Sequence, residues 1–106
     1  MPEIKAILAD CDVRFIRHLE SMLSDLWLDL NICGRASDGR QAAQLIETLT
    51  PQLAFLDVRL PNICGMQVAR KFADSCAIVF VTAFEHYAAN AFESGAVDYL
   101  IKPVSR

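Results

Sequence analysis

Short apolar runs alternate with segments of helical periodicity along the chain, and this alternation sharply limits the folds open to it. The runs predicted as strands are Ile4–Ala9, Leu30–Ala36, Leu53–Leu56, Ala77–Val81 and Asp98–Ile101. Between these runs, apolar residues recur every three or four positions, as they do on one side of an amphipathic helix. Strict alternation of strands and helices predicts an α/β fold, a doubly wound five-stranded parallel sheet with helices on both faces.

The connecting helices are predicted from their apolar sides and their end signals. The apolar positions of the first three are Phe15, Ile16, Leu19, Met22, Leu23 and Leu26, then Ala42, Ala43, Leu45, Ile46 and Leu49, then Met66, Ala69 and Phe72. Asp38 is the expected N-cap of the second, with Gln41 three residues on. The fourth is expected from about His86 to Ser94, and Gly95 suits its left-handed C-terminal position.

Only Pro103–Arg106 follows the last predicted strand, whereas a series of this kind normally ends with a helix. We therefore expect residues 1–106 to be one domain of a longer protein that continues into that helix and a further domain. Without the helix, the face of strands one, three and five would be an exposed apolar patch.

Composition restricts the class of protein. The chain has 106 residues, a net charge of −3 and scattered Lys and Arg, so it lacks the basic stripe of a nucleic-acid-binding protein. No charged leader precedes a long apolar segment, and no apolar stretch approaches the ~18–20 residues that span a bilayer. We expect a cytoplasmic protein that binds neither membrane nor, through this segment, DNA.

Four cysteines, Cys11, Cys33, Cys64 and Cys76, form no CxxC pair and have no histidine at a zinc-binding spacing. A metal knuckle or a redox dithiol is therefore not indicated. We expect them mostly to be small buried apolar residues.

Polar side chains stand where four of the five apolar runs stop, namely Asp10, Asp57, Thr82 and Lys102. In an open parallel sheet, ligands bind in the crevice outside the carboxyl ends of the strands. Two carboxylates, a hydroxyl and an ammonium are therefore expected to converge there, as a phosphate-handling site requires.

Taken singly, most of these residues have an ordinary structural explanation. Asp10 and Asp12 are each suited to cap the first helix, Lys102 can be a solvated charge and Thr82 an ordinary strand residue. Asp57 is harder to explain, because a carboxylate after a buried strand is costly unless a cation faces it. Their joint order favours the functional interpretation.

The chain resembles the receiver domains of two-component response regulators, with the CheY-like (flavodoxin-like) strand order 2-1-3-4-5. The resemblance covers the whole chain and rests on four motifs in order: Asp10-Cys11-Asp12, Phe55 to Pro61 with Gly65 following, Val81-Thr82-Ala83, and Asp98 to Pro103. The segment from Phe80 to Pro103 further resembles receivers that precede a LytTR-type DNA-binding domain.

The resemblance implies a role for each motif. Asp57 would accept a phosphoryl group from a sensor histidine kinase, with Lys102 and Thr82 binding phosphoryl oxygens. The implied Mg²⁺ ligands are Asp10, Asp12, Asp57 and the backbone carbonyl of Arg59. The Lys102–Pro103 bond is expected to be cis, as is common in this family.

Signalling in such domains works by a population shift rather than by enzymatic turnover. Thr82 and Tyr99 would be the switch residues, and the face of the fourth helix and fifth strand would change shape. That face would control a C-terminal output domain, expected to be a transcriptional regulator, and is a plausible homodimer interface.

One position departs from the family pattern. Cys11 replaces the second of two adjacent acids, normally a direct Mg²⁺ ligand, and Mg²⁺ prefers oxygen to sulfur. Two alternatives to a working receiver therefore remain open. One is a pseudo-receiver that acts only as an interaction module, and the other is a nucleotide- or flavin-binding domain. The second is disfavoured because the turn after the first strand is acidic and has no glycine.

Overall fold

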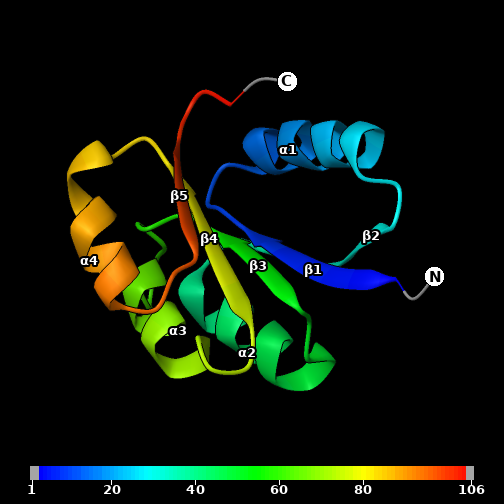
Figure 1. The fold of residues 1–106 in the computed structure, drawn as a ribbon. Helices are drawn as coiled ribbons and strands as arrows, with labels where there is room; N and C mark the ends of the chain where they lie inside the picture. The colour runs from blue at the N-terminus through cyan, green and yellow to red at the C-terminus, as the bar shows by residue number, and fades with distance from the viewer. Residues whose placement is uncertain (1–2, 105–106) are drawn as a thin grey trace.

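The computed structural model describes residues 3–104, which form one five-stranded parallel sheet with helices on both faces (Figure 1). The strands are β1 (Ile4–Ala9), β2 (Leu30–Ala36), β3 (Leu53–Leu56), β4 (Ala77–Thr82) and β5 (Asp98–Ile101). Their order is β2-β1-β3-β4-β5, and every neighbouring pair is parallel. The predicted fold class and strand order are confirmed, and β4 runs one residue further than expected, to Thr82.

The helices are α1 (Val13–Leu26), α2 (Gly39–Leu49), α3 (Gly65–Phe72) and α4 (Ala88–Glu93). Figure 1 shows α1 on one face of the sheet and α2, α3 and α4 on the other. The segment predicted as one helix from about His86 to Ser94 is divided, because a 3₁₀ turn, Glu85–Tyr87, precedes α4. Gly95 follows α4 with φ +99°, as predicted for a left-handed C-terminal glycine.

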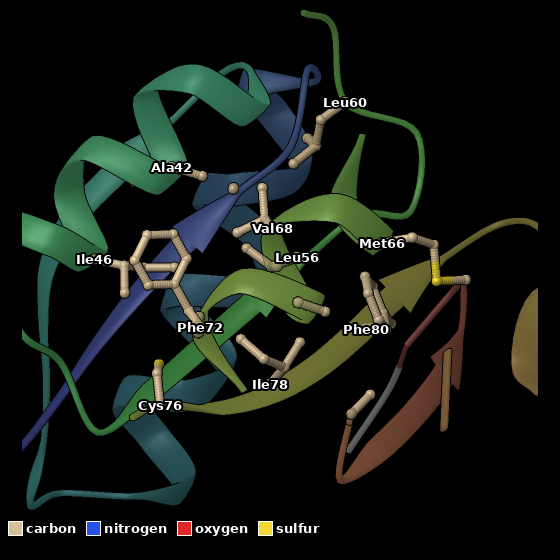
Figure 2. Packing of buried hydrophobic residues seen from close by; sticks show 14 of the residues in the cluster. Ala42, Ile46, Leu56, Leu60, Met66, Val68, Phe72, Cys76, Ile78 and Phe80 are labelled. Atoms are coloured by element: carbon tan, nitrogen blue, oxygen red, sulfur yellow. The ribbon is translucent and has the colours of Figure 1, made fainter. Parts of the chain in front are cut away.

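The hydrophobic core has two layers, one on each face of the sheet. The larger layer lies between the sheet and helices α2 and α3, and Figure 2 shows its side chains packing there. The smaller layer lies beneath α1 and includes Leu8, Leu19 and Phe55. Leu26 was predicted to face this layer but is 64% exposed, because it is the last residue of α1.

The face of the sheet beside α1 is better covered than the sequence predicted. Phe55 and Val81 are buried there, and Val104 packs against the same cluster. Exposed apolar side chains remain towards the β5 edge, where Leu100 is 39% and Val97 61% exposed. Of the patch predicted over the first, third and fifth strands, only the part near β5 is therefore exposed.

The cysteines do not all behave as small core residues. Cys76 is buried, Cys33 and Cys64 are partly buried, and Cys11 is exposed. The prediction is wrong for Cys11 because it lies in the turn between β1 and the start of α1. Within residues 3–104, no helix is long and apolar enough to cross a membrane.

Candidate functional site

The carboxyl ends of the parallel strands bring the four predicted polar residues together. Lys102, just after β5, places its Nζ 2.7 Å from Asp10 Oδ2 and 3.1 Å from Asp57 Oδ2. Thr82, the last residue of β4, donates its hydroxyl to Asp57 Oδ1 at 2.7 Å. The expected convergence is confirmed, and the Lys102–Pro103 bond is cis as predicted.

Burial determines the electrostatics of this cluster. Asp10, Asp57 and Thr82 are at most 6% exposed, so the two carboxylates depend on Lys102 for neutralisation. Burial raises the pKa of Asp10 in spite of the hydrogen bond from Lys102. Burial alone would lower the pKa of Lys102, but its hydrogen bonds to Asp10 and Asp57 outweigh that effect, and its pKa is raised. The lysine therefore stays charged at neutral pH.

An aromatic ring from α1 also contacts Lys102. The Lys102 ammonium lies 4.2 Å from the centroid of the Phe15 ring, within the range of a cation–π contact. The sequence analysis assigned Phe15 only to the apolar side of the first helix. Nothing in the sequence indicated this contact, because it joins residues near opposite ends of the chain.

The loop after β3 is held close to the Asp57 carboxylate. The Arg59 amide donates to Asp57 Oδ1 at 3.2 Å, and the Gly65 amide donates to the carbonyl of Val58 at 2.8 Å. A Cβ added at Gly65 would lie 2.2 Å from the Asp57 carbonyl oxygen. Only glycine therefore allows α3 to begin this close to Asp57.

The loop between β4 and α4 is linked to both sides of the site. The Tyr99 hydroxyl donates to the carbonyl of Phe84, and the Phe84 amide donates to Thr82 Oγ1 at 3.5 Å. The Arg59 guanidinium lies 4.4 Å from the Phe84 ring centroid and donates to the Tyr87 hydroxyl at 3.3 Å. Tyr99 thus points inward and packs against the main core, and burial raises its pKa. The sequence analysis did not identify the roles of Phe84 and Tyr87, which depend on contacts between distant segments.

Asp12 does not join the buried cluster. Its carboxylate accepts the Arg14 amide at 3.0 Å and caps α1, as the structural interpretation of this residue predicted. Its own amide donates to Asp10 Oδ1. In the described part of the chain, no three His, Cys, Asp or Glu side chains converge so as to hold a metal ion.

The oxygen donors nevertheless fit a small hard cation. Mg²⁺ usually takes only one or two protein carboxylates and keeps several waters. Asp10 and Asp57 approach the same ammonium, so both carboxylates already face one cationic centre. The exposed thiol of Cys11 adds no oxygen donor. The two carboxylates therefore fit Mg²⁺, and Cys11 leaves the site with fewer oxygen donors than the family pattern supplies.

Comparison with known proteins identifies the family. The model of the response regulator receiver domain matches residues 6–106. The chain belongs to the response regulator receiver family. This assignment favours a receiver over the nucleotide- or flavin-binding alternative, and receiver domains are in general signalling modules rather than enzymes.

The receiver is similar to several larger proteins. It is 42% identical over 103 residues to an uncharacterized response regulatory protein of Vibrio cholerae. The matched region covers 94% of this chain and 40% of that protein. It is 42% identical over 82 residues to the sensory transduction protein LytT of Oceanobacillus iheyensis, over 73% of this chain and 33% of LytT. The receiver thus spans well under half the length of these relatives.

A solved structure agrees with the fold. The signal receiver domain of the response regulator NarL from Mycobacterium tuberculosis superposes with a TM-score of 0.91 and 26% identity, covering 99% of this chain and 88% of that chain. Receiver domains generally bind Mg²⁺ at the phosphorylation site and work with sensor kinases and output domains.

Proposed function

We propose that this receiver accepts a phosphoryl group on Asp57 from the phosphohistidine of a sensor histidine kinase. One observation carries the proposal: Asp57 is buried, yet its two oxygens face a lysine and a hydroxyl at hydrogen-bonding distance. A buried carboxylate with this environment is suited to nucleophilic attack and to charge stabilisation afterwards.

In the proposed reaction, a carboxylate oxygen of Asp57 attacks phosphorus as the phosphorus–nitrogen bond to the histidine breaks. The imidazole leaves with the bonding electron pair, and an acyl phosphate remains on Asp57. Lys102 offsets charge on the phosphoryl oxygens, and Thr82 transfers its hydrogen bond from the carboxylate to one of them. Mg²⁺, held by Asp10, Asp57 and the Arg59 carbonyl, would supply a second positive charge when bound.

The switch would start at Thr82. The Phe84 amide contacts Thr82 Oγ1 and the Phe84 carbonyl accepts the Tyr99 hydroxyl, so displacement of Thr82 is passed to Tyr99 through one residue. Tyr99 belongs to β5, and the loop leads into α4. We infer that phosphorylation changes the α4 and β5 face and so biases an output domain or a homodimer.

We infer further that residues 1–106 are the N-terminal receiver of a longer cytoplasmic regulator whose output domain is a LytTR-type DNA-binding domain. Two similar proteins support this inference. One is LytT, and the other is the positive alginate biosynthesis regulatory protein of Pseudomonas aeruginosa, 42% identical over 72 residues. DNA binding would belong to that output domain and not to this segment.

A pseudo-receiver is the second candidate, and a specific observation favours it. Cys11 occupies the expected position of an acid, and the nearby Asp12 is engaged as a helix cap. If Mg²⁺ cannot bind, the domain would act as an interaction module without phosphorylation.

Intact-mass measurement after incubation with acetyl phosphate separates the two candidates. We expect one phosphoryl adduct that requires both Mg²⁺ and Asp57, so Asp57→Asn is the control. Cys11→Asp, which restores the missing oxygen donor, should increase labelling at low Mg²⁺. Absence of an adduct in the wild type, together with its appearance in Cys11→Asp, would establish the pseudo-receiver.

A further inference from the structure

A groove lies between the loop after β3, helix α3 and the start of α4, on the side of the sheet away from α1. Its volume is about 470 Å³, within the range of ligand sites. Its apolar floor is formed by the edges of Val58, Leu60 and Met66, core residues that are at most 7% exposed, and Tyr87 lies on the α4 side. Helices α3 and α4 contact each other and lie on this side of the sheet (Figure 1).

Two arginines give this groove positive charge. Arg59 and Arg70 both line it. Within residues 3–104, neither guanidinium forms an ion pair with an Asp or Glu side chain. An anionic partner would therefore find two cations that are not neutralised within the protein.

A second groove, between α1 and the end of β2, contains an arginine that is paired with a carboxylate. This arginine, Arg35, is exposed and lies beside apolar residues. There the guanidinium is bound by both carboxylate oxygens of Glu20, through its Nε and one terminal nitrogen. Arg35 is therefore neutralised within the protein, whereas Arg59 and Arg70 are not; Arg17, which also lines the second groove, has no ion pair among residues 3–104 either.

Arg59 is also held in place before any ligand arrives. Its guanidinium stacks on the Phe84 ring at 4.4 Å and donates to the Tyr87 hydroxyl at 3.3 Å. A cation fixed in this way loses little side-chain freedom when it binds a carboxylate, which favours affinity. Guanidinium groups bind carboxylates with two parallel hydrogen bonds.

We propose that the groove between α3 and α4 binds a short acidic peptide segment of a partner protein. One apolar side chain of the peptide lies against Val58, Leu60 and Met66. Carboxylates on either side of it pair with Arg59 and Arg70. This binding does not require the phosphorylation proposed for Asp57, so it is tested on the unphosphorylated protein.

The test uses the dye-labelled peptide Gly-Asp-Leu-Phe-Glu-Gly and measures fluorescence anisotropy at low ionic strength. We expect saturable binding that weakens as salt rises, because the pairing is electrostatic and exposed. A peptide with Asn and Gln in place of Asp and Glu should bind at least about tenfold more weakly, since a charge-assisted pair is worth roughly a factor of ten.

Matched arginine variants locate the site. Arg70→Gln should weaken binding about tenfold, whereas Arg40→Gln, an exposed arginine on α2, should leave the affinity unchanged. Arg59→Gln, in the loop after β3, is a second variant that should also weaken binding. Amide NMR shifts on titration should concentrate at residues 58–60 and 66–70. Equal binding of the neutral peptide, equal affinity of the Arg70 and Arg40 variants, or shifts confined to the groove at Arg35 would each overturn the proposal.

Discussion

Within residues 3–104, the charge balance of the site depends on Lys102 alone. Lys102 lies between two buried carboxylates and beside the ring of Phe15. Removing one member of a buried ionic cluster leaves the others without compensation, which is far costlier than losing a surface charge.

Lys102→Met should lower the free energy of unfolding by about 2–3 kcal/mol, because Asp10 and Asp57 would face each other without a cation. Urea denaturation at pH 7 measures the change. The control is Lys71→Met on the exposed side of α3, which should stay within about 0.5 kcal/mol of the wild type. Equal stability of the two variants would contradict the predicted role of Lys102.

Cys76 should make stability depend on alkaline pH. Burial raises the pKa of its thiol to about 11 from an ordinary 9.0. Between these values the folded chain keeps a proton that the unfolded chain has lost, so stability is full below about pH 9 and falls as pH rises to about 11.

Urea unfolding between pH 8.5 and 10.5 tests this prediction. The wild type should lose roughly 1–2 kcal/mol more than Cys76→Ala over that interval. The exposed Cys11 serves as the matched control, and Cys11→Ala should keep the steep wild-type profile. Parallel profiles for the wild type and Cys76→Ala would exclude the buried thiol as the cause.

At the scale of elements, the central strands were predictable because they are continuous apolar runs covered on both faces, as in Leu53–Leu56 and Ala77–Thr82. The start of α2 was equally clear, because Asp38 accepts the Gln41 amide at 2.7 Å. The division before α4 was not predictable, since alanine-rich sequence fits a helix throughout. Phe84 and Tyr87 precede that division and receive their contacts from Arg59, far away in the sequence.

The C-terminus of α2 contains a residue with a strained backbone conformation, and a substitution can relieve that strain. Thr50 adopts the left-handed conformation with φ 45°, which a β-branched residue disfavours. Thr50→Gly should therefore raise the free energy of unfolding by about 0.5–1 kcal/mol.

Replacement of another threonine of the same segment, Thr48, by glycine is the control for Thr50→Gly. Thr48→Gly lies inside α2, where glycine should lower stability by about 0.5 kcal/mol. Changes of opposite sign in the free energy of unfolding, measured by chemical denaturation, would support the assignment of strain to Thr50. A loss of stability in both variants would refute it.

For the whole molecule, the meeting of Asp10, Asp57, Thr82 and Lys102 was predicted from the parallel sheet, whose strands end at one edge. The order of the strands came from the resemblance to receiver domains. The sequence did not decide how Asp12 is used, since one carboxylate is suited both to a helix cap and to a metal. That choice depends on the path of a three-residue turn, which only the folded chain defines.

Metal binding should be detectable as a gain in global stability. A ligand that binds only the folded state stabilises it by RT ln(1 + [L]/Kd), about 1.4 kcal/mol at ten times Kd. In thermal unfolding, Cys11→Asp should gain more from 10 mM MgCl₂ than the wild type does, by roughly 1 kcal/mol. Asp57→Asn should gain least, and equal gains in all three proteins would show that Mg²⁺ does not bind at this site.

The ion pair between Asp10 and Lys102 spans 92 positions of sequence. On the ribosome, the first of these residues emerges long before the second, and the strand that precedes Lys102 pairs last in the order of synthesis. A nascent or prematurely terminated chain therefore possesses its acceptor carboxylate without the ammonium that neutralises it. The phosphorylation proposed for Asp57 thus requires synthesis of the receiver at least as far as Lys102, and a chain that stops before that residue would stay silent towards its kinase.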